Sequence, residues 1–184
     1  MEQHFYTGKG IGVVMLDTGI YPHIDFGDRI WGFCDFVSNK KQIYDDNGHG
    51  TCVAGILGGS GAASGGRYRG MAPECGLVAL KVLDRFGNGS RVDVLRAFSW
   101  IIKNRERYRI RVVNISVGTT YRTRNDHDDL VRGVEKLWDE GLVVVAAAGN
   151  QGPDPGSVTA PGCSKKIITV GSSDMLTGER AVSG

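Results

Sequence analysis

Short, continuous runs of apolar residues recur along the chain. They lie at residues 11–16, 77–83, 112–117, 142–148 and 167–170, and each is rich in valine, isoleucine or leucine with glycine or polar residues at its borders. Runs of this length and composition are typical of strands that are buried on both faces of a sheet. The pattern therefore predicts buried strands at these places.

Apolar positions with helical spacing fill several of the intervals between these runs. One set spans residues 92–102, and another spans residues 130–138 and stops at Gly141. A third helix is expected to begin near His49, with its apolar positions within residues 53–57. Strands that alternate with helices predict an α/β fold, in which helices cover both faces of a mainly parallel central sheet in three layers, α/β/α.

Composition and charge narrow the classes of partner. A chain of 184 residues is long enough for one domain with a substantial core, and we expect residues 1–184 to form one unit. The formal net charge is only +2, from 22 basic and 20 acidic residues. Such a balance gives no strong field to attract nucleic acid or a membrane surface, so neither is expected as a partner.

The N-terminus and the cysteines bear on the compartment. The first eight residues have no basic segment followed by an apolar core, and no apolar run reaches the roughly 18 residues that a membrane helix needs. The four cysteines are widely spaced without a Cys-x-x-Cys pair, which favours free thiols in a reducing compartment. We expect a cytoplasmic protein; the alternative is a secreted protein whose signal and propeptide are missing from this chain.

Three polar residues stand directly after predicted strands or at a helix start. Asp17 follows the first strand, His49 lies between two glycines at a helix start, and Asn150 ends the run at 142–149. An open α/β sheet has its ligand site at the carboxyl ends of its strands. A carboxylate can orient an imidazole that acts as a general base, and an amide can donate to a developing oxyanion. Each residue alone also fits a turn or surface position.

Taken together, three motifs in this order resemble the subtilisin-like serine peptidases, the S8 family. They are Asp17-Thr18-Gly19, His49-Gly50-Thr51 with Val53-Ala54-Gly55, and Ala147-Ala148-Gly149-Asn150. The resemblance extends from residue 7 to residue 171, and the loop at 59–73 is similar to the bacterial intracellular or minor extracellular branch. It implies a subtilisin-like fold and a serine endopeptidase, in which Asp17 orients His49, His49 takes the proton of the nucleophile and Asn150 stabilises the oxyanion.

The resemblance also implies residues that bind an extended peptide or protein substrate. Two segments are similar to the edges that pair with the main chain of such a peptide: Gly87, Asn88 and Gly89, and Ser116, Val117 and Gly118. Ala147, Ala148 and Gly149 are similar to the residues that line the pocket for the side chain before the cleaved bond. Because these residues are small, we expect a large apolar side chain there.

The sequence departs from many relatives in two places. Cys52 stands where many have histidine, and it is either a small buried residue or a thiol that makes the complete enzyme sensitive to mercurials. Asp25 resembles one calcium ligand of secreted relatives, but the loop at 58–66 contains no carboxylate, and calcium takes six to eight oxygen ligands. We expect no cofactor for the chemistry, and a structural calcium ion has no support beyond Asp25.

The nucleophile of the family lies in a Gly-Thr-Ser-Met-type segment well after the asparagine. The serines that follow Asn150 lack such neighbours; they are Ser157, Ser164, Ser172, Ser173 and Ser183. We therefore expect an N-terminal part of a single S8 catalytic domain, incomplete at the C-terminus, that needs the missing C-terminal segment as its partner. Alone it should be inactive, and poorly soluble or molten.

Three other interpretations compete with this one. The chain could bind peptides in the same groove without cleaving them. It could be a nucleotide-binding domain, since residues 8–12 read Gly-Lys-Gly-Ile-Gly, although these glycines precede a strand rather than join a strand to a helix. It could be a cysteine peptidase that uses Cys52 or Cys163, although Cys52 shares the predicted helix with His49 and Cys163 follows a Pro-Gly turn.

Overall fold

The computed structural model describes residues 6–119 and 128–172, so Ser173 and Ser183 lie outside the described residues. The chain divides into two compact units, Met1–Val112 and Val113–Gly184. The expectation of one catalytic domain over the whole chain stays a prediction.

The first unit contains three parallel strands whose carboxyl ends are aligned. β1 (Gly12–Asp17) and β2 (Ile30–Asp35) both pair with β3 (Gly76–Lys81) in parallel. In this register Lys81 is opposite Asp17 on one side and opposite Asp35 on the other. Three charged residues therefore end neighbouring strands at the same edge of the sheet.

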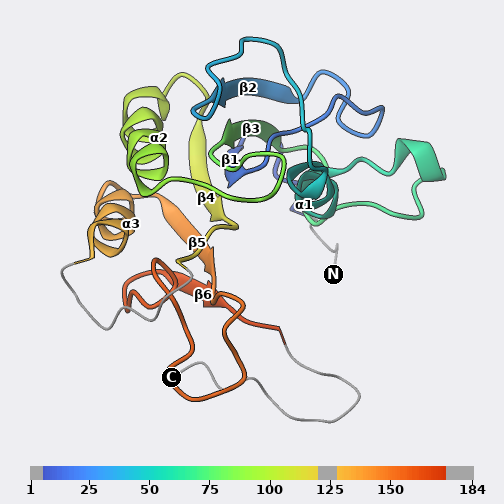
Figure 1. Cartoon of the computed structure of the whole chain (residues 1–184). Coiled ribbons are helices and arrows are strands. Elements are labelled where there is room, and N and C mark those ends of the chain that lie inside the picture. Colours follow the sequence, from blue (N-terminus) through green and yellow to red (C-terminus); the bar gives the residue numbers. More distant parts are fainter. Residues whose placement is uncertain (1–5, 120–127, 173–184) are drawn as a thin grey trace. The chain divides into compact units, whose positions relative to one another are not determined.

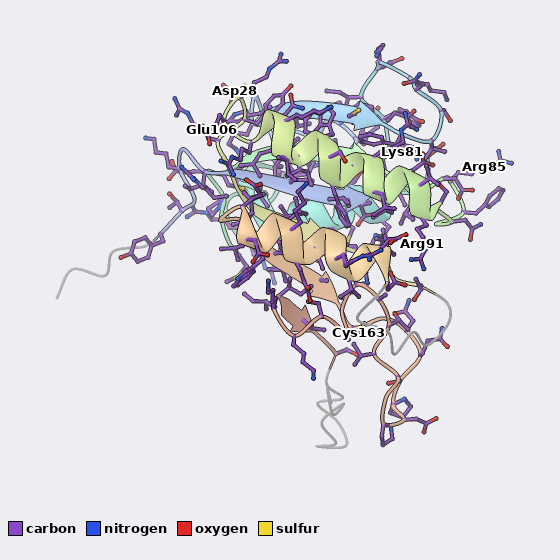
Figure 2. All side chains as sticks on the ribbon, turned by 90° about the vertical axis from the view of Figure 1, so that its left-hand side faces the viewer. Asp28, Lys81, Arg85, Arg91, Glu106 and Cys163 are labelled. Carbon is purple, nitrogen blue, oxygen red and sulfur yellow. The ribbon has the colours of Figure 1, made fainter. Side chains whose placement is uncertain are left out.

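Two helices cover this sheet from opposite faces, which makes three layers within the first unit (Figures 1 and 2). α1 (His49–Gly58) contacts β1 and β3 on one face, and α2 (Arg91–Asn104) contacts β1 on the other. β1 and β3 are buried along their whole length, as expected for strands between two helical layers. The core between α1 and the sheet includes Val13, Met15, Ala54, Leu77 and Ala79.

The second unit contains α3 (Asp129–Asp139) and the parallel pair of β5 (Val143–Ala147) and β6 (Ile168–Val170). β4 (Ile110–Ile115) begins in the first unit and ends in the second. α3 packs against β5, where alternate residues are buried and exposed. The expectation that β5 and β6 are buried on both faces is therefore wrong: both ends of β5 and both ends of β6 are exposed.

Most elements lie where the hydrophobic pattern places them. The five expected strands and three expected helices are present, with β4 beginning two residues earlier than expected. β2 was not expected, and the loop after α1 contains a short 3-10 turn, η1 (Ala62–Ser64). Within the described residues, no helix is both long enough and apolar enough to cross a membrane.

Candidate active site

Asp17 is a buried carboxylate at the end of β1. Its side chain is 1% exposed, and its carbonyl oxygen accepts hydrogen bonds from the amides of Val82 (3.0 Å) and Leu83 (3.2 Å). The carboxylate oxygen Oδ1 accepts from the Thr18 amide at 2.7 Å and lies 2.7 Å from Nδ1 of His49. The other oxygen, Oδ2, is buried and has no hydrogen-bond partner among the described residues. Asp17 is thus fixed by its own strand and aims one oxygen at His49.

His49 is the first residue of α1, and its side chain is 55% exposed. An ionised carboxylate only accepts hydrogen bonds, so the contact with Asp17 places the proton of a neutral imidazole on Nδ1. The other ring nitrogen, Nε2, then has a free lone pair. A buried carboxylate behind an exposed imidazole is the arrangement that a general base requires.

Gly50 lets the start of α1 approach the end of β1. A side chain at this position would overlap the carbonyl oxygen of Gly19 and would bring a Cβ atom within 3.2 Å of Cβ of Asp17. Only glycine removes this clash, because the neighbouring atoms belong to the backbone of Gly19 or to Asp17. Of the two glycines that flank His49, Gly50 therefore has a packing role, whereas Gly48 has open space around it and φ of 101°.

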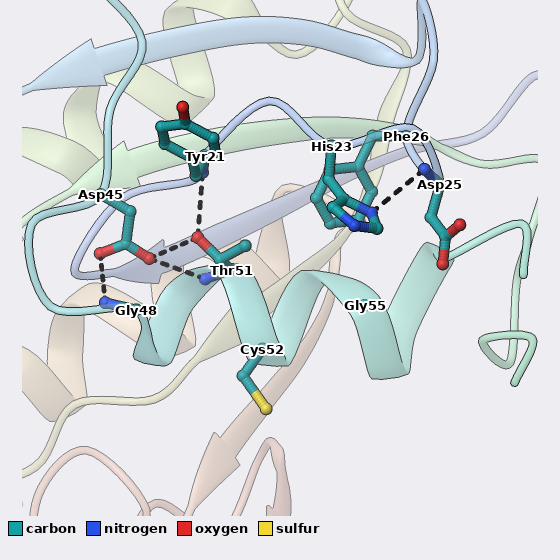
Figure 3. A pocket seen from close by; sticks show the side chains of 9 residues that line it. All are labelled: Tyr21, His23, Asp25, Phe26, Asp45, Gly48, Thr51, Cys52 and Gly55. Carbon is teal, nitrogen blue, oxygen red and sulfur yellow. Dashed lines mark hydrogen bonds between the residues drawn. The ribbon is translucent and has the colours of Figure 1, made fainter. Parts of the chain in front are cut away.

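Asp45 organises the loop that leads into α1, and the sequence analysis gave it no role. Its carboxylate accepts hydrogen bonds from the amides of Gly48 and Thr51 and from the Thr51 hydroxyl (Figure 3). It also accepts from the Asn47 amide and from the Thr18 hydroxyl. Burial alone would raise the pKa of Asp45, but the Thr51 hydroxyl and the three amides outweigh that effect and lower the pKa to about 2. Asp45 is therefore a carboxylate at every pH near neutrality.

Lys81 is a buried cation at the end of β3 (Figure 2). Its side chain is 1% exposed, and Nζ donates to the carbonyl oxygens of Thr18 (2.6 Å) and Leu83 (2.8 Å) and to Oδ1 of Asp46 (2.6 Å). These three bonds use all three donors of an ammonium group. Lys81 thus connects the ends of β1 and β3 with the loop before α1.

A cavity of about 370 Å³ lies beside α1 and is lined mainly by apolar surface, with Tyr21, His23 and Cys52 among its residues (Figure 3). Cys52 is a free and exposed cysteine. The interpretation of Cys52 as a small buried residue is therefore wrong. A thiol on α1, one turn after His49, is open to solvent and to thiol reagents.

The residues around Asp25 do not fit a calcium site. One carboxylate oxygen of Asp25 accepts from the Ala63 amide at 2.7 Å, and its carbonyl oxygen accepts from the Arg29 guanidinium. Arg29 also donates to the carbonyl oxygens of Gly58 (2.7 Å) and Cys75 (3.1 Å). A guanidinium therefore takes the carbonyl oxygens that a cation would need, and its charge repels a second cation. The part of the chain that the structure describes has no group of three or more acidic, histidine or cysteine side chains that could hold a metal ion.

In the second unit, the structure brings together the segments 116–118 and 147–149. A Cβ atom at Gly118 would lie 3.9 Å from Cα of Gly149. Asn150 follows as an exposed residue, and Gly149 has φ of 99°, which favours glycine. The expected substrate-binding segments of this unit are therefore neighbours, with the expected oxyanion donor at their end.

Thr159 fills the space next to these glycines, and sequence reasoning missed it. Its hydroxyl would lie 3.0 Å from a Cβ atom at Gly118 and would overlap one at Gly149. Thr159 is 1% exposed, and its hydroxyl has no partner among the described residues. The Thr159 amide donates to the Ala148 carbonyl at 3.0 Å, which holds the residue in place. The small residues therefore leave less room than their own size suggests.

The other expected substrate edge lies in the first unit, after β3. Gly87, Asn88 and Gly89 are exposed in a tight loop, in which Oδ1 of Asp84 accepts from the amides of Phe86 and Asn88 at 2.8 and 2.9 Å. An exposed and internally bonded loop can present its backbone to a peptide without being rearranged. Its role in substrate binding stays a prediction.

The Subtilase family, peptidase S8, matches residues 8–182 of this chain. The chain belongs to the subtilase family. The prediction that rested on the motifs around Asp17, His49 and Asn150 is thereby confirmed at the level of the family.

Individual subtilases are similar over most of this chain. Serine protease AprX of Bacillus subtilis is 48% identical over 174 residues, which cover 91% of this chain and 39% of AprX. Minor extracellular protease Epr of the same species is 40% identical over 146 residues, or 79% of this chain and 21% of Epr. A cold-adapted subtilisin-like serine proteinase of known crystal structure is 31% identical with a TM-score of 0.76, over 92% of this chain and 57% of that chain. The chain thus spans about a fifth to three fifths of the length of these subtilases.

Proposed function

We propose that Asp17, His49 and Asn150 supply the acid, the base and the oxyanion donor, respectively, of a serine endopeptidase. The observation that carries the proposal is the contact of 2.7 Å between Oδ1 of the buried Asp17 and Nδ1 of the exposed His49. Membership of the subtilase family supports the same chemistry, because relatives across the family are named serine proteases. The substrate is an extended peptide or a protein.

In the proposed reaction, a serine hydroxyl attacks a peptide carbonyl while Nε2 of His49 takes its proton. Asp17 holds the ring orientation and stabilises the imidazolium that forms. His49 then gives the proton to the leaving amine, and Asn150 donates to the oxyanion of the tetrahedral intermediate. Water repeats these steps on the acyl-enzyme and releases the second product.

The serine in this proposal comes from outside the 184 residues. The sequence contains no Gly-Thr-Ser segment, and the described Ser164 is buried and donates its hydroxyl to Glu135 at 3.0 Å. A C-terminal segment of the same catalytic domain is thus the proposed partner.

A fluorophosphonate probe, which modifies an activated serine, tests this proposal. We expect no labelling of the 184-residue chain by itself. A fusion of this chain to the part of AprX that follows the matched region should be labelled with one probe per molecule and should hydrolyse peptide substrates. We name this protein the AprX fusion. Stoichiometric labelling of the chain alone contradicts the proposal that the serine lies outside it. A folded fusion that binds peptides but is not labelled favours the peptide-binding alternative.

Substrate preference depends on Thr159 in our proposal. In the AprX fusion, Thr159→Gly should raise kcat/KM for a substrate with a large aromatic side chain before the cleaved bond, relative to one with alanine there, by about tenfold. The reason is that Thr159 lies against Gly118 and Gly149 and limits the space between them. Thr159→Val is the matched control, because it keeps the volume and removes only the unpaired hydroxyl. An equal change of preference in both variants would contradict a steric role.

We also expect that the region around Asp25 and Arg29 in the AprX fusion is stable without calcium. Adding EDTA should leave the contribution of the Asp25 region to the free energy of unfolding unchanged. Arg29→Met should lower the free energy of unfolding by about 2 kcal/mol, because it leaves the carbonyl oxygens of Gly58 and Cys75 unpaired. Thermal unfolding with and without EDTA measures both effects. Arg96→Met, which removes an exposed arginine paired with Asp93, is the control. If calcium raises the unfolding temperature of the Arg29→Met variant and of the parent equally, Arg29 does not occupy the place of a cation in this region.

A further inference from the structure

We propose that Asp45 is a positioning residue that acts through Thr18 to hold His49 against Asp17. The inference rests on the proposed function for its catalytic consequence. Its structural basis is a closed set of hydrogen bonds that joins the end of β1 to the start of α1. Neither Asp45 nor Thr18 touches the reacting atoms in the proposed mechanism, so their effect on the reaction passes through the two residues that do.

The start of α1 has no cap of its own. The residue before the helix is Gly48, which has φ of 101° and no side chain that could accept from the first amides of α1. Asp45 takes over part of that role: Oδ1 accepts from the Gly48 amide and Oδ2 from the Thr51 amide, both at 2.9 Å. Its negative charge also lies at the end of the helix where the macrodipole favours an anion. The helix that begins with His49 is therefore anchored at Asp45.

Thr18 connects this anchor to the catalytic acid. Its hydroxyl donates to Oδ1 of Asp45 and accepts from the Gly50 amide, each at 2.9 Å. Its amide donates at 2.7 Å to the oxygen of Asp17 that also contacts His49. One residue thus holds the carboxylate of Asp17 through its backbone and the first turn of α1 through its side chain.

Further contacts brace the same loop against the chain that leaves β1. Gly19 and Asp45 form an antiparallel bridge, and the Ile20 amide donates to the Tyr44 carbonyl at 3.3 Å. The Tyr21 amide donates to the hydroxyl of Thr51 at 2.9 Å, and that hydroxyl donates to Asp45 at 2.6 Å (Figure 3). Most of these contacts join the chain after β1 to residues far away in the sequence, so together they fasten the start of α1 to the end of β1.

A loss of this anchor should act on turnover more than on binding. The His49–Asp17 contact of 2.7 Å tolerates little displacement, and a shift of about 1 Å in a catalytic group can cost on the order of 100-fold in rate. The expected substrate edges do not include Asp45 or Thr18. A positioning role therefore predicts a fall in kcat with KM nearly unchanged.

The test uses Thr18→Val, Thr18→Ser and Asp45→Asn in the AprX fusion. Thr18→Val and Asp45→Asn should lower kcat by about 10- to 100-fold with KM within about twofold of the parent. Thr18→Ser keeps the hydroxyl and should retain kcat within about threefold. NMR supplies a second readout: the Nδ1 proton of His49, assigned with His49→Gln, should lose its downfield resonance in the first two variants and keep it in Thr18→Ser.

Asp35→Asn is the matched control. Asp35 is 3% exposed, ends β2 and accepts four hydrogen bonds, from three amides and the Tyr44 hydroxyl, but it does not contact Thr18 or α1. It should lower the unfolding midpoint while leaving kcat and the His49 resonance unchanged. Parent values of kcat and resonance in Thr18→Val and Asp45→Asn, or equal losses in Asp35→Asn, would overturn the inference. An inactive fusion that shows the expected NMR pattern would refute the proposed function and support the positioning role.

Discussion

Replacing His49 by alanine in the AprX fusion should lower kcat by about 10⁶-fold, the magnitude measured for loss of this residue in subtilisin itself. The reason lies in the geometry: the exposed imidazole has its Nδ1 fixed by the buried Asp17, so Nε2 is the base available to a serine. KM should change little, because the proton transfer contributes to the transition state and not to the bound substrate. Steady-state kinetics on a peptide substrate give both constants.

Two variants control for this effect. Asp17→Asn should lower kcat by about 10⁴-fold, as for the corresponding change in serine peptidases generally, because an amide favours the wrong tautomer of His49. His23→Ala removes another exposed histidine of the same unit and should leave kcat within about twofold, since the His23 ring accepts from the Asp25 amide at 3.2 Å and contacts the Phe26 ring, and has no part in the proposed reaction. A His49→Ala enzyme that keeps a hundredth of the parent kcat would show that another group serves as the base.

Local patterns in the sequence were sufficient for most of the scaffold. β1 and β3 are short, buried throughout and apolar up to their last residues, because a helix packs on each face of the sheet in the first unit. α2 and α3 show the helical spacing of apolar residues and begin after Ser90 and Asp128, whose side chains accept from amides of the first turn. These are signals within one element, so they can be recognised without knowing the fold.

β2 shows where such patterns fail. Its sequence, Ile-Trp-Gly-Phe-Cys-Asp, is interrupted by a glycine, and five of its six residues are only partly buried. It pairs with β3 alone among the strands of the first unit, so less apolar surface is needed than in a central strand. A strand of this kind is defined by its partner, and the partner is not visible in a local window.

The same distinction applies to the site. Asp17 and His49 could be predicted, because each stands at a recognisable boundary and the motifs around them resemble the subtilases. Asp45 acts through side-chain contacts with Thr18, 27 residues away in the sequence. Its place before Asn47-Gly48 indicates a turn, but only the fold shows that this turn closes on the end of β1.

Lys81→Met should lower the free energy of unfolding of the AprX fusion by about 3 kcal/mol. The side chain is 1% exposed, and its ammonium group donates to two carbonyl oxygens and to Asp46. Methionine fills a similar volume, so the loss comes from the unpaired carbonyl oxygens of Thr18 and Leu83. The sequence analysis gave Lys81 no role, because it lies inside the apolar run at 77–83; only the pairing of β1 with β3 places it opposite Asp17. Urea-induced unfolding measures the change.

Lys166→Met is the matched control, because it removes a lysine with a comparable number of short contacts but an exposed side chain. Nζ of Lys166 lies 2.9 Å from both oxygens of Asp139, yet water solvates both partners. Exposed ion pairs contribute little, so the urea midpoint should stay at the parent value. If the two variants shift the midpoint equally, the contacts of Lys81 do not stabilise the fold. If only Lys81→Met shifts it, the buried cation is what joins β1, β3 and the loop before α1, and it stabilises the frame on which Asp17 and His49 meet.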